Sequence, residues 1–222
     1  MTTKLVLFDL DGTLLDTSEG IVESVRWAAE RLGRPALSQC QLLSFIGPPL
    51  TASFQRCYGC DAEQAAALTA AYREHYREGA MFLARPYDGI VTVCETLLQR
   101  GCATAVATSK PELFAKQILQ KFDMDRLFTV IHGADMDGRL SKADVIRLCM
   151  EEVGAAPSAC LMVGDTKHDA IGAQEVGIPF LGVTYGFGDL AELRAAPQAA
   201  LVDAPPEILD VVFGKGGTEQ HG

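Results

Sequence analysis

The stretch LVLFDLDGTLLDTSEG, residues 5–20, leads four apolar residues directly into two aspartates, Asp9 and Asp11. Such a run predicts a buried strand, and alternate residues of a strand point to the same side. Both carboxylates can therefore face one point beyond the strand end, where Gly12 permits a sharp turn or the close approach of a ligand. Turn formation explains Asp11 but not a buried, unpaired Asp9. A bound cation would offset the free-energy cost of burying the Asp9 carboxylate, and oxygen ligands favour Mg²⁺.

Further apolar runs alternate with stretches of helical length along the rest of the chain. Continuous apolar strands separated by helices predict a doubly wound, Rossmann-like parallel sheet, an α/β fold whose sites lie at the carboxyl ends of the strands. The expected strands are residues 4–10, 103–108, 128–132, 160–164 and 180–184, and the expected helices are residues 89–100, 112–122, 142–153 and 169–176.

One long stretch after the first strand contains no convincing strand. It reads as helices at residues 19–32, 39–45, 50–58 and 62–78. We therefore expect an inserted all-helical domain, residues 17–82, within an α/β core formed by residues 1–16 and 83–213. Residues 85–89 read as the link back into the core, and the Gly-rich polar tail 214–222 is expected to be disordered.

Composition and charge argue against several classes of protein. The chain of 222 residues has a net charge of −10, which makes nucleic acid and anionic membranes poor partners. The apolar run at residues 5–8 is too short for a signal core or a membrane span, so we expect a cytoplasmic protein. Seven scattered cysteines agree with that. Cys57 and Cys60 form a C-x-x-C pattern, which we interpret as free thiols because no second Cys/His pair has zinc-ligand spacing.

A second group of polar residues lies where other predicted strands end. Asp165 follows the strand at 160–164, and Asp169 lies one helical turn later. Each of these acids is also explained by the start of a helix. Thr108 stands at a strand tip with its hydroxyl available for a ligand, whereas Ser109 and Glu112 form a capping-box pattern.

Lys142 is out of place by local rules, because it opens a predicted helix whose dipole disfavours a cation in the first turn. Such conflicts are expected at functional sites, although an exposed lysine is the simpler alternative. Carboxylates, a hydroxyl and an ammonium at strand and helix ends suit phosphoryl transfer, because Mg²⁺ and a lysine can neutralise charge on the phosphoryl oxygens. The residues alone thus predict a metal-assisted phosphate site.

These motifs together resemble a known family. Residues 9–14, DLDGTL, match the first motif of the haloacid dehalogenase superfamily, Thr108 the second, Lys142 the third, and Gly164-Asp165 with Asp169 the fourth. Their order and spacing over residues 4 to about 210 fit this family, and the chain most resembles its phosphoglycolate-phosphatase-like branch.

The resemblance implies a magnesium-dependent phosphatase that hydrolyses a small phosphate monoester through an aspartyl-phosphate intermediate. Asp9 would be the nucleophile, and Asp11 would protonate the leaving oxygen and then activate water. The phosphate would be held by Thr108, Lys142 and backbone donors at Asp11, Gly12 and Ser109. The implied magnesium ligands are a side-chain oxygen of Asp9, the backbone carbonyl of Asp11 and Asp165, with Asp169 supporting the metal shell through water.

The helical insertion resembles the family's cap, which closes over the phosphate and selects the leaving group. Residues 45–50, FIGPPL, are our candidate for the cap loop that faces the site, with Gly47, Pro48 and Arg56 as candidate substrate residues. An ordinary turn between helices explains the loop equally well.

Several readings stay open. An acid at Asp11 argues against relatives that cleave carbon–halogen or phosphonate bonds, because those lack one at that position. A phosphomutase keeps both acids, and a receiver-type phosphoacceptor signalling module combines similar residues. The substrate is open among phosphoglycolate, a nucleoside monophosphate (as for a 5′-nucleotidase) and a sugar phosphate. Both a monomer and a homodimer fit the sequence.

Overall fold

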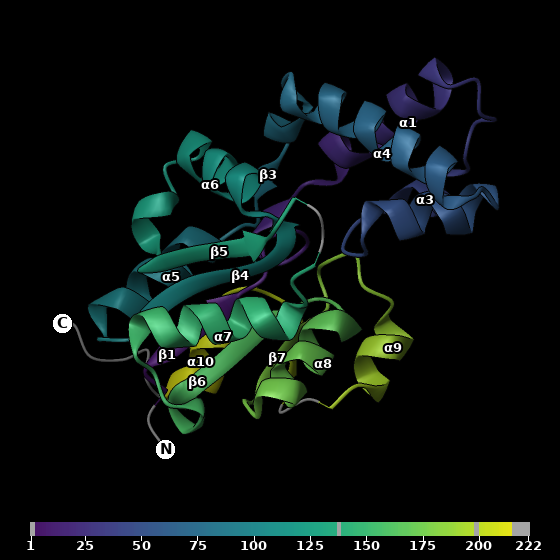
Figure 1. The fold of residues 1–222 in the computed structure, drawn as a ribbon. Coiled ribbons are helices and arrows are strands. Elements are labelled where there is room, and N and C mark those ends of the chain that lie inside the picture. Colours follow the sequence, from purple (N-terminus) through teal and green to yellow (C-terminus); the bar gives the residue numbers. More distant parts are fainter. Residues whose placement is uncertain (1–2, 137–138, 198–199, 215–222) are drawn as a thin grey trace. The chain divides into compact units, whose positions relative to one another are not determined.

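The computed structural model describes residues 3–136, 139–197 and 200–214. The chain divides into two compact units, shown in Figure 1: a core unit, Met1–Leu15 with Pro86–Gly222, and a helical unit, Asp16–Arg85. The helical unit covers the stretch that we expected to be an insertion. Apart from Gly214, the tail expected to be disordered lies outside the described residues.

The core unit is built on a six-stranded parallel sheet in the order β5-β4-β1-β6-β7-β8. This confirms the predicted fold class. The central strand β1 and its neighbour β6 are buried at every residue, which explains their unbroken apolar sequences. The strands are β1 (Leu5–Phe8), β4 (Ala103–Pro111), β5 (Val130–Ala134), β6 (Cys160–Gly164), β7 (Phe180–Val183) and β8 (Ala200–Val202).

Helices cover both faces of this sheet, with α7 and α8 in front and α5 and α10 behind in the view of Figure 1. On the front face, Leu5 and Leu7 of β1 belong to one buried cluster with Ile146 of α7 and Ala170 of α8. The core helices are α5 (Ile90–Gln99), α6 (Glu112–Lys121), α7 (Lys142–Val153), α8 (Lys167–Val176), α9 (Leu190–Ala195) and α10 (Glu207–Phe213).

The helical unit contains α1 (Ser18–Arg31), α2 (Gln39–Leu43), α3 (Leu50–Tyr58) and α4 (Ala62–Arg77). Helix α1 packs on α4. At Gly20 the carbonyl of Ala80 comes so close that no side chain would fit. Two short strands, β2 (Leu15–Asp16) and β3 (Arg85–Pro86), pair where the chain passes from one unit to the other.

The cysteines agree with the sequence-based interpretation. Cys57 and Cys60 are free thiols at the end of α3, which stops at a left-handed Gly59. The four cysteines in apolar stretches are buried: Cys94, Cys102, Cys149 and Cys160. Among the described residues, no helix has both the length and the apolar character needed to cross a membrane.

Candidate active site

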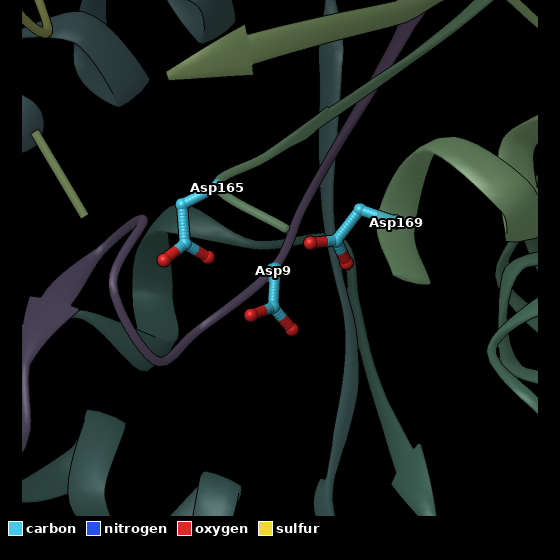
Figure 2. Close-up of side chains that lie close together, drawn as sticks. All are labelled: Asp9, Asp165 and Asp169. Atoms are coloured by element: carbon cyan, nitrogen blue, oxygen red, sulfur yellow. The ribbon is translucent and has the colours of Figure 1, made fainter. Parts of the chain in front are cut away.

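Three aspartates meet at the carboxyl end of the parallel sheet. Asp9 follows β1, Asp165 follows β6, and Asp169 lies in the first turn of α8. Each can place a carboxylate oxygen within 4.8 Å of the other two, and the side chains converge in Figure 2. All three residues are at most 5% exposed. The parallel topology thus joins two of the predicted motifs with a buried cluster of negative charge.

Lys142, the first residue of α7, places its ammonium among these acids. Its Nζ lies 2.7 Å from Oδ1 of Asp9 and 2.8 Å from Oδ1 of Asp169, and it donates a hydrogen bond of 2.9 Å to the carbonyl of Ala107. Burial alone would lower the pKa of Lys142, but the carboxylates of Asp169 and Asp9 outweigh it and raise the pKa. Lys142 is therefore a fixed cation at neutral pH.

Two of the acids, Asp9 and Asp165, have pKa values above their usual range. Burial raises the pKa of Asp9 to about 6, against the lowering effect of Lys142. Burial, with Asp169 and Asp9 adding to it, raises the pKa of Asp165 well above its usual range. Two amides donate to Oδ2 of Asp165, whereas its buried Oδ1 accepts no hydrogen bond from the described part of the chain. A cluster of carboxylates, one of which has a buried oxygen without a hydrogen bond, is suited to binding a divalent cation.

The start of α8 explains Asp169 but not Asp165, although the sequence allowed it for both acids. The N-cap is Thr166, and Oδ2 of Asp169 accepts hydrogen bonds from its amide and hydroxyl. Asp169 therefore both closes a capping box and presents Oδ1 to Lys142. Asp165 has no capping role, which leaves its carboxylate available for a ligand.

A buried lysine that sequence reasoning missed contacts Asp11. Nζ of Lys110 lies 3.0 Å from Oδ1 of Asp11, and the two side chains are only 5% and 10% exposed. The signal in the sequence is weak, because Lys110 follows an exposed serine and reads as a solvated residue. Its one clue is that it lies two residues beyond Thr108, so an extended strand would bring both to one side.

A bulge at the end of β4 arranges these residues. Thr108 pairs with Gly133 of β5 and Pro111 with Ala134, so two residues of β4 have no counterpart. A side chain at Gly133 would overlap the carbonyl of Lys110. Thr108 is 1% exposed, and its Oγ1 accepts a hydrogen bond from the amide of Lys110. Bulges of this kind re-aim side chains next to active sites.

The predicted cap at Ser109 is wrong. The bulge carries β4 through Pro111, which takes the N-cap position of α6, and no side chain caps that helix. Glu112 instead accepts hydrogen bonds from His132 and Gly133 of β5 and from Lys116. Ser109 is exposed and stays a candidate phosphate residue.

Gly12 forms the turn after the first motif in a left-handed conformation, with φ of +81°. Its amide donates to the carbonyl of Leu15 at 2.9 Å. A Cβ atom at Gly12 would overlap the carboxylate of Asp165. Two separate physical requirements, positive φ and close approach, thus explain glycine here.

The candidate substrate residues lie in the helical unit. Gly47 has φ of +98° in the loop before α3, and Pro48 is half-buried beside it. Arg56 donates hydrogen bonds to the carbonyl and hydroxyl of Ser44 and to the hydroxyl of Ser53. These bonds tie α3 to the end of α2, and a substrate role for Gly47, Pro48 or Arg56 stays a prediction.

Known proteins with similar sequences or structures include a 5′-nucleotidase, a tyrosine-protein kinase and a predicted phosphatase. A 5′-nucleotidase from Pseudomonas aeruginosa is 44% identical over 86% of each chain. The tyrosine-protein kinase PtkA from Mycobacterium tuberculosis is 36% identical over 94% of this chain and 73% of its own. The crystal structure of a predicted phosphatase from Clostridium acetobutylicum has a TM-score of 0.91 and 38% identity, covering 96% of this chain and 99% of that one.

The family model for haloacid dehalogenase-like hydrolases matches residues 6–183. This range contains Asp9 and Asp11 of the first motif and extends beyond Asp165 and Asp169 of the fourth. These findings confirm the enzyme class predicted from the sequence, a phosphoric monoester hydrolase similar to phosphoglycolate phosphatases or 5′-nucleotidases. The chain therefore belongs to the haloacid dehalogenase-like hydrolases.

Proposed function

We propose that the protein is a magnesium-dependent phosphatase that hydrolyses a small phosphate monoester through a phosphorylated Asp9. The observation that carries the proposal is the ammonium of Lys142, which lies between Asp9 and Asp169, two members of a cluster of three buried aspartates. A nucleophilic carboxylate held by a lysine next to a cluster of carboxylate oxygens is suited to phosphoryl transfer.

In the first half of the reaction, an oxygen of Asp9 attacks phosphorus while the bond to the leaving oxygen breaks. Asp11 gives its proton to that oxygen, and the alcohol departs. Lys142 keeps Asp9 oriented, and the Thr108 hydroxyl donates a hydrogen bond to a phosphoryl oxygen. Thr108 can do so because its oxygen already accepts from the Lys110 amide, which leaves its proton for the ligand.

In the second half, water attacks the phosphorus of the aspartyl phosphate and gives its proton to the Asp11 carboxylate. The acyl-phosphate bond breaks, inorganic phosphate leaves, and Asp9 and Asp11 return to their starting states. Lys110 lies against Asp11 at 3.0 Å and keeps that carboxylate at the strand end between the two halves.

Asp9, Asp165 and the backbone carbonyl of Asp11 would hold the metal ion, with Asp169 supporting it through water. Bound magnesium would neutralise charge on the phosphoryl oxygens. When Asp11 is ionised, the four buried carboxylates and two ammonium groups leave two negative charges, which one divalent cation offsets.

For the substrate, we propose a nucleoside 5′-monophosphate, supported by the 44% identity with a 5′-nucleotidase over 86% of each chain. The helical unit would act as the cap that closes over the phosphate and selects the leaving group. Phosphoglycolate and sugar phosphates are the comparison substrates.

The experiment is release of inorganic phosphate from p-nitrophenyl phosphate and from a panel of nucleotides, phosphoglycolate and sugar phosphates. We expect repeated turnover with Mg²⁺, none after chelation, and none in Asp9→Asn, with nucleoside monophosphates preferred. Turnover without metal, or turnover retained by folded Asp9→Asn, would contradict the mechanism. A single burst that leaves a stable phosphoprotein would instead favour a signalling module.

A further inference from the structure

The segment between β7 and α9, residues 185–188 with the sequence YGFG, lies against Asp165 although none of the motifs includes it. The amides of Phe187 and Gly188 donate hydrogen bonds of 2.7 Å and 3.1 Å to Oδ2 of Asp165. This segment follows a different strand from the one that carries Asp165. A contact of this kind decides which way the carboxylate faces.

The two oxygens of Asp165 are therefore not equivalent. Oδ2 is held by two amide donors, whereas Oδ1 is buried and accepts no hydrogen bond from any described residue. A buried carboxylate oxygen without a partner is costly, and a bound cation at Oδ1 would offset that cost. Fixing one oxygen by backbone donors presents the other one in a constant direction.

The glycines of the segment make this contact possible. A Cβ atom at Gly186 would overlap the Asp165 carboxylate, and one at Gly188 would overlap its carbonyl. Gly12 presses on the same carboxylate from the turn after β1. Three glycines from two chain segments thus enclose Asp165, and no side chain separates the backbone from it.

Tyr185 anchors the segment to the first motif. Its hydroxyl donates a hydrogen bond of 3.1 Å to the carbonyl of Thr13, next to Gly12. Its ring also packs on Tyr87, with centroids 4.7 Å apart. The strand end that carries Asp9 and the loop that holds Asp165 are therefore joined through one phenol.

We propose that residues 185–188 form a clamp that positions Asp165 for a divalent cation, with Tyr185 as its positioning residue. The proposal rests on the magnesium site proposed above and adds residues that do not touch the metal. Binding a cation to a restrained carboxylate loses less conformational freedom than binding it to a mobile one. Loss of such outer-shell support typically weakens metal affinity about 10- to 100-fold.

The test is calorimetric titration of Mg²⁺ into the metal-free, full-length protein without substrate. Tyr185→Phe removes only the hydroxyl that bonds Thr13. The matched control is Tyr58→Phe, which removes a hydroxyl that bonds the carbonyl of Pro35, also at 3.1 Å, in the helical unit. We expect Kd for Mg²⁺ to rise about 10-fold in Tyr185→Phe and to stay within about twofold of wild type in Tyr58→Phe.

Equal Kd values for Tyr185→Phe and wild type would overturn the clamp, as would equal weakening in both variants. Gly186→Ala displaces the segment without altering the phenol and should weaken Mg²⁺ binding as well. If Tyr185→Phe does not fold, the Kd of Gly186→Ala for Mg²⁺ tests the clamp in its place, and a Kd equal to that of wild type would overturn the proposal. If the wild-type protein binds no Mg²⁺, the proposed metal site itself is wrong. If wild type and Tyr185→Phe bind Mg²⁺ equally well, only the clamp is wrong.

Discussion

The ammonium of Lys142 lies 2.7 Å from Oδ1 of Asp9, and the two side chains are only 7% and 8% exposed. The pair links the first turn of α7 to the end of the central strand β1, across 133 residues of sequence. The stem of Lys142 fits beside α8 because Gly172 leaves room for it. Lys142 thus stabilises the neighbouring carboxylates, although the helix dipole disfavours a positive charge at the start of α7.

Replacing this lysine by Met keeps the volume of the side chain and removes its charge. Breaking one partner of a buried ion pair typically costs about 3–5 kcal/mol, so Lys142→Met should melt far below wild type without metal. Its turnover should fall about 100-fold or more, because Asp9 loses its orienting contact. Unfolding curves with and without Mg²⁺, and phosphate release, are the measurements.

Lys116→Met is the control for Lys142→Met, because it breaks the exposed ion pair between Lys116 and Glu112 on α6. Exposed pairs contribute about 0–1 kcal/mol, so this variant should keep its stability and its turnover. Similar losses of stability and turnover in the two variants would mean that the buried ion pairs of Lys142 contribute no more than an exposed ion pair.

The pair of Lys110 and Asp11 predicts a double-mutant cycle in stability. Lys110→Met leaves the Asp11 carboxylate buried beside an apolar group and should cost about 3 kcal/mol. Lys110→Met combined with Asp11→Asn removes both charges and should recover most of that loss. Chemical denaturation of the four proteins measures the coupling free energy. Additive losses would show that the two groups do not stabilise each other.

Much of the core could be predicted because its signals are local and strong. Strand β6 has the expected bounds, since burial on both faces keeps its sequence continuously apolar. Helix α7 also has the expected bounds, because Ser141 and Asp144 form a capping box and Gly154 ends the helix in a left-handed conformation.

Other features depend on tertiary contacts and leave little trace in the sequence. Strand β8 has three residues and helix α9 six, too few for a clear hydrophobic period. The buried position of Lys110 follows from the bulge in β4, which requires Gly133 on the neighbouring strand. The contact of residues 185–188 with Asp165 joins segments that follow different strands. The two-residue spacing of Thr108 and Lys110 is only a weak clue to the first contact, and no periodic pattern predicts the second.

Gly133→Ala tests whether the bulge in β4 places Thr108. The new methyl group would overlap the Lys110 carbonyl and crowd Glu112, so the end of β4 must move. Because small misplacements near the chemistry can cost about 100-fold, we expect at least a 10-fold fall in kcat/KM. Steady-state kinetics with p-nitrophenyl phosphate measure it.

Gly154→Ala separates that effect from a general loss of stability. Gly154 has φ of +71° and no neighbour that a Cβ atom would meet, so alanine there is strained without crowding the site. It should lower stability by about 1 kcal/mol and leave kcat/KM unchanged. Loss of activity in both variants in proportion to stability would refute a placing role for the bulge.

Asp16 should make the stability of the protein depend on pH. Burial acts to raise the pKa of Asp16, but hydrogen bonds from the amide and hydroxyl of Ser18, and then Arg85, outweigh it and lower the pKa. A carboxylate whose folded pKa lies below its unfolded value, near 4, stabilises the protein above that value. This contribution is lost as the pH falls through the folded pKa.

Asp16→Asn keeps an oxygen acceptor and removes the charge, so it should cost about 1 kcal/mol at pH 7 and progressively less below about pH 4. Arg85 is 81% exposed, so the bonds from Ser18 account for most of the effect, and Arg85→Met should cost well under 1 kcal/mol. Thermal unfolding between pH 2.5 and pH 7 provides the measurement. A difference between Asp16→Asn and wild type that stays constant with pH would show that the amide's shape, and not the missing charge, causes the loss.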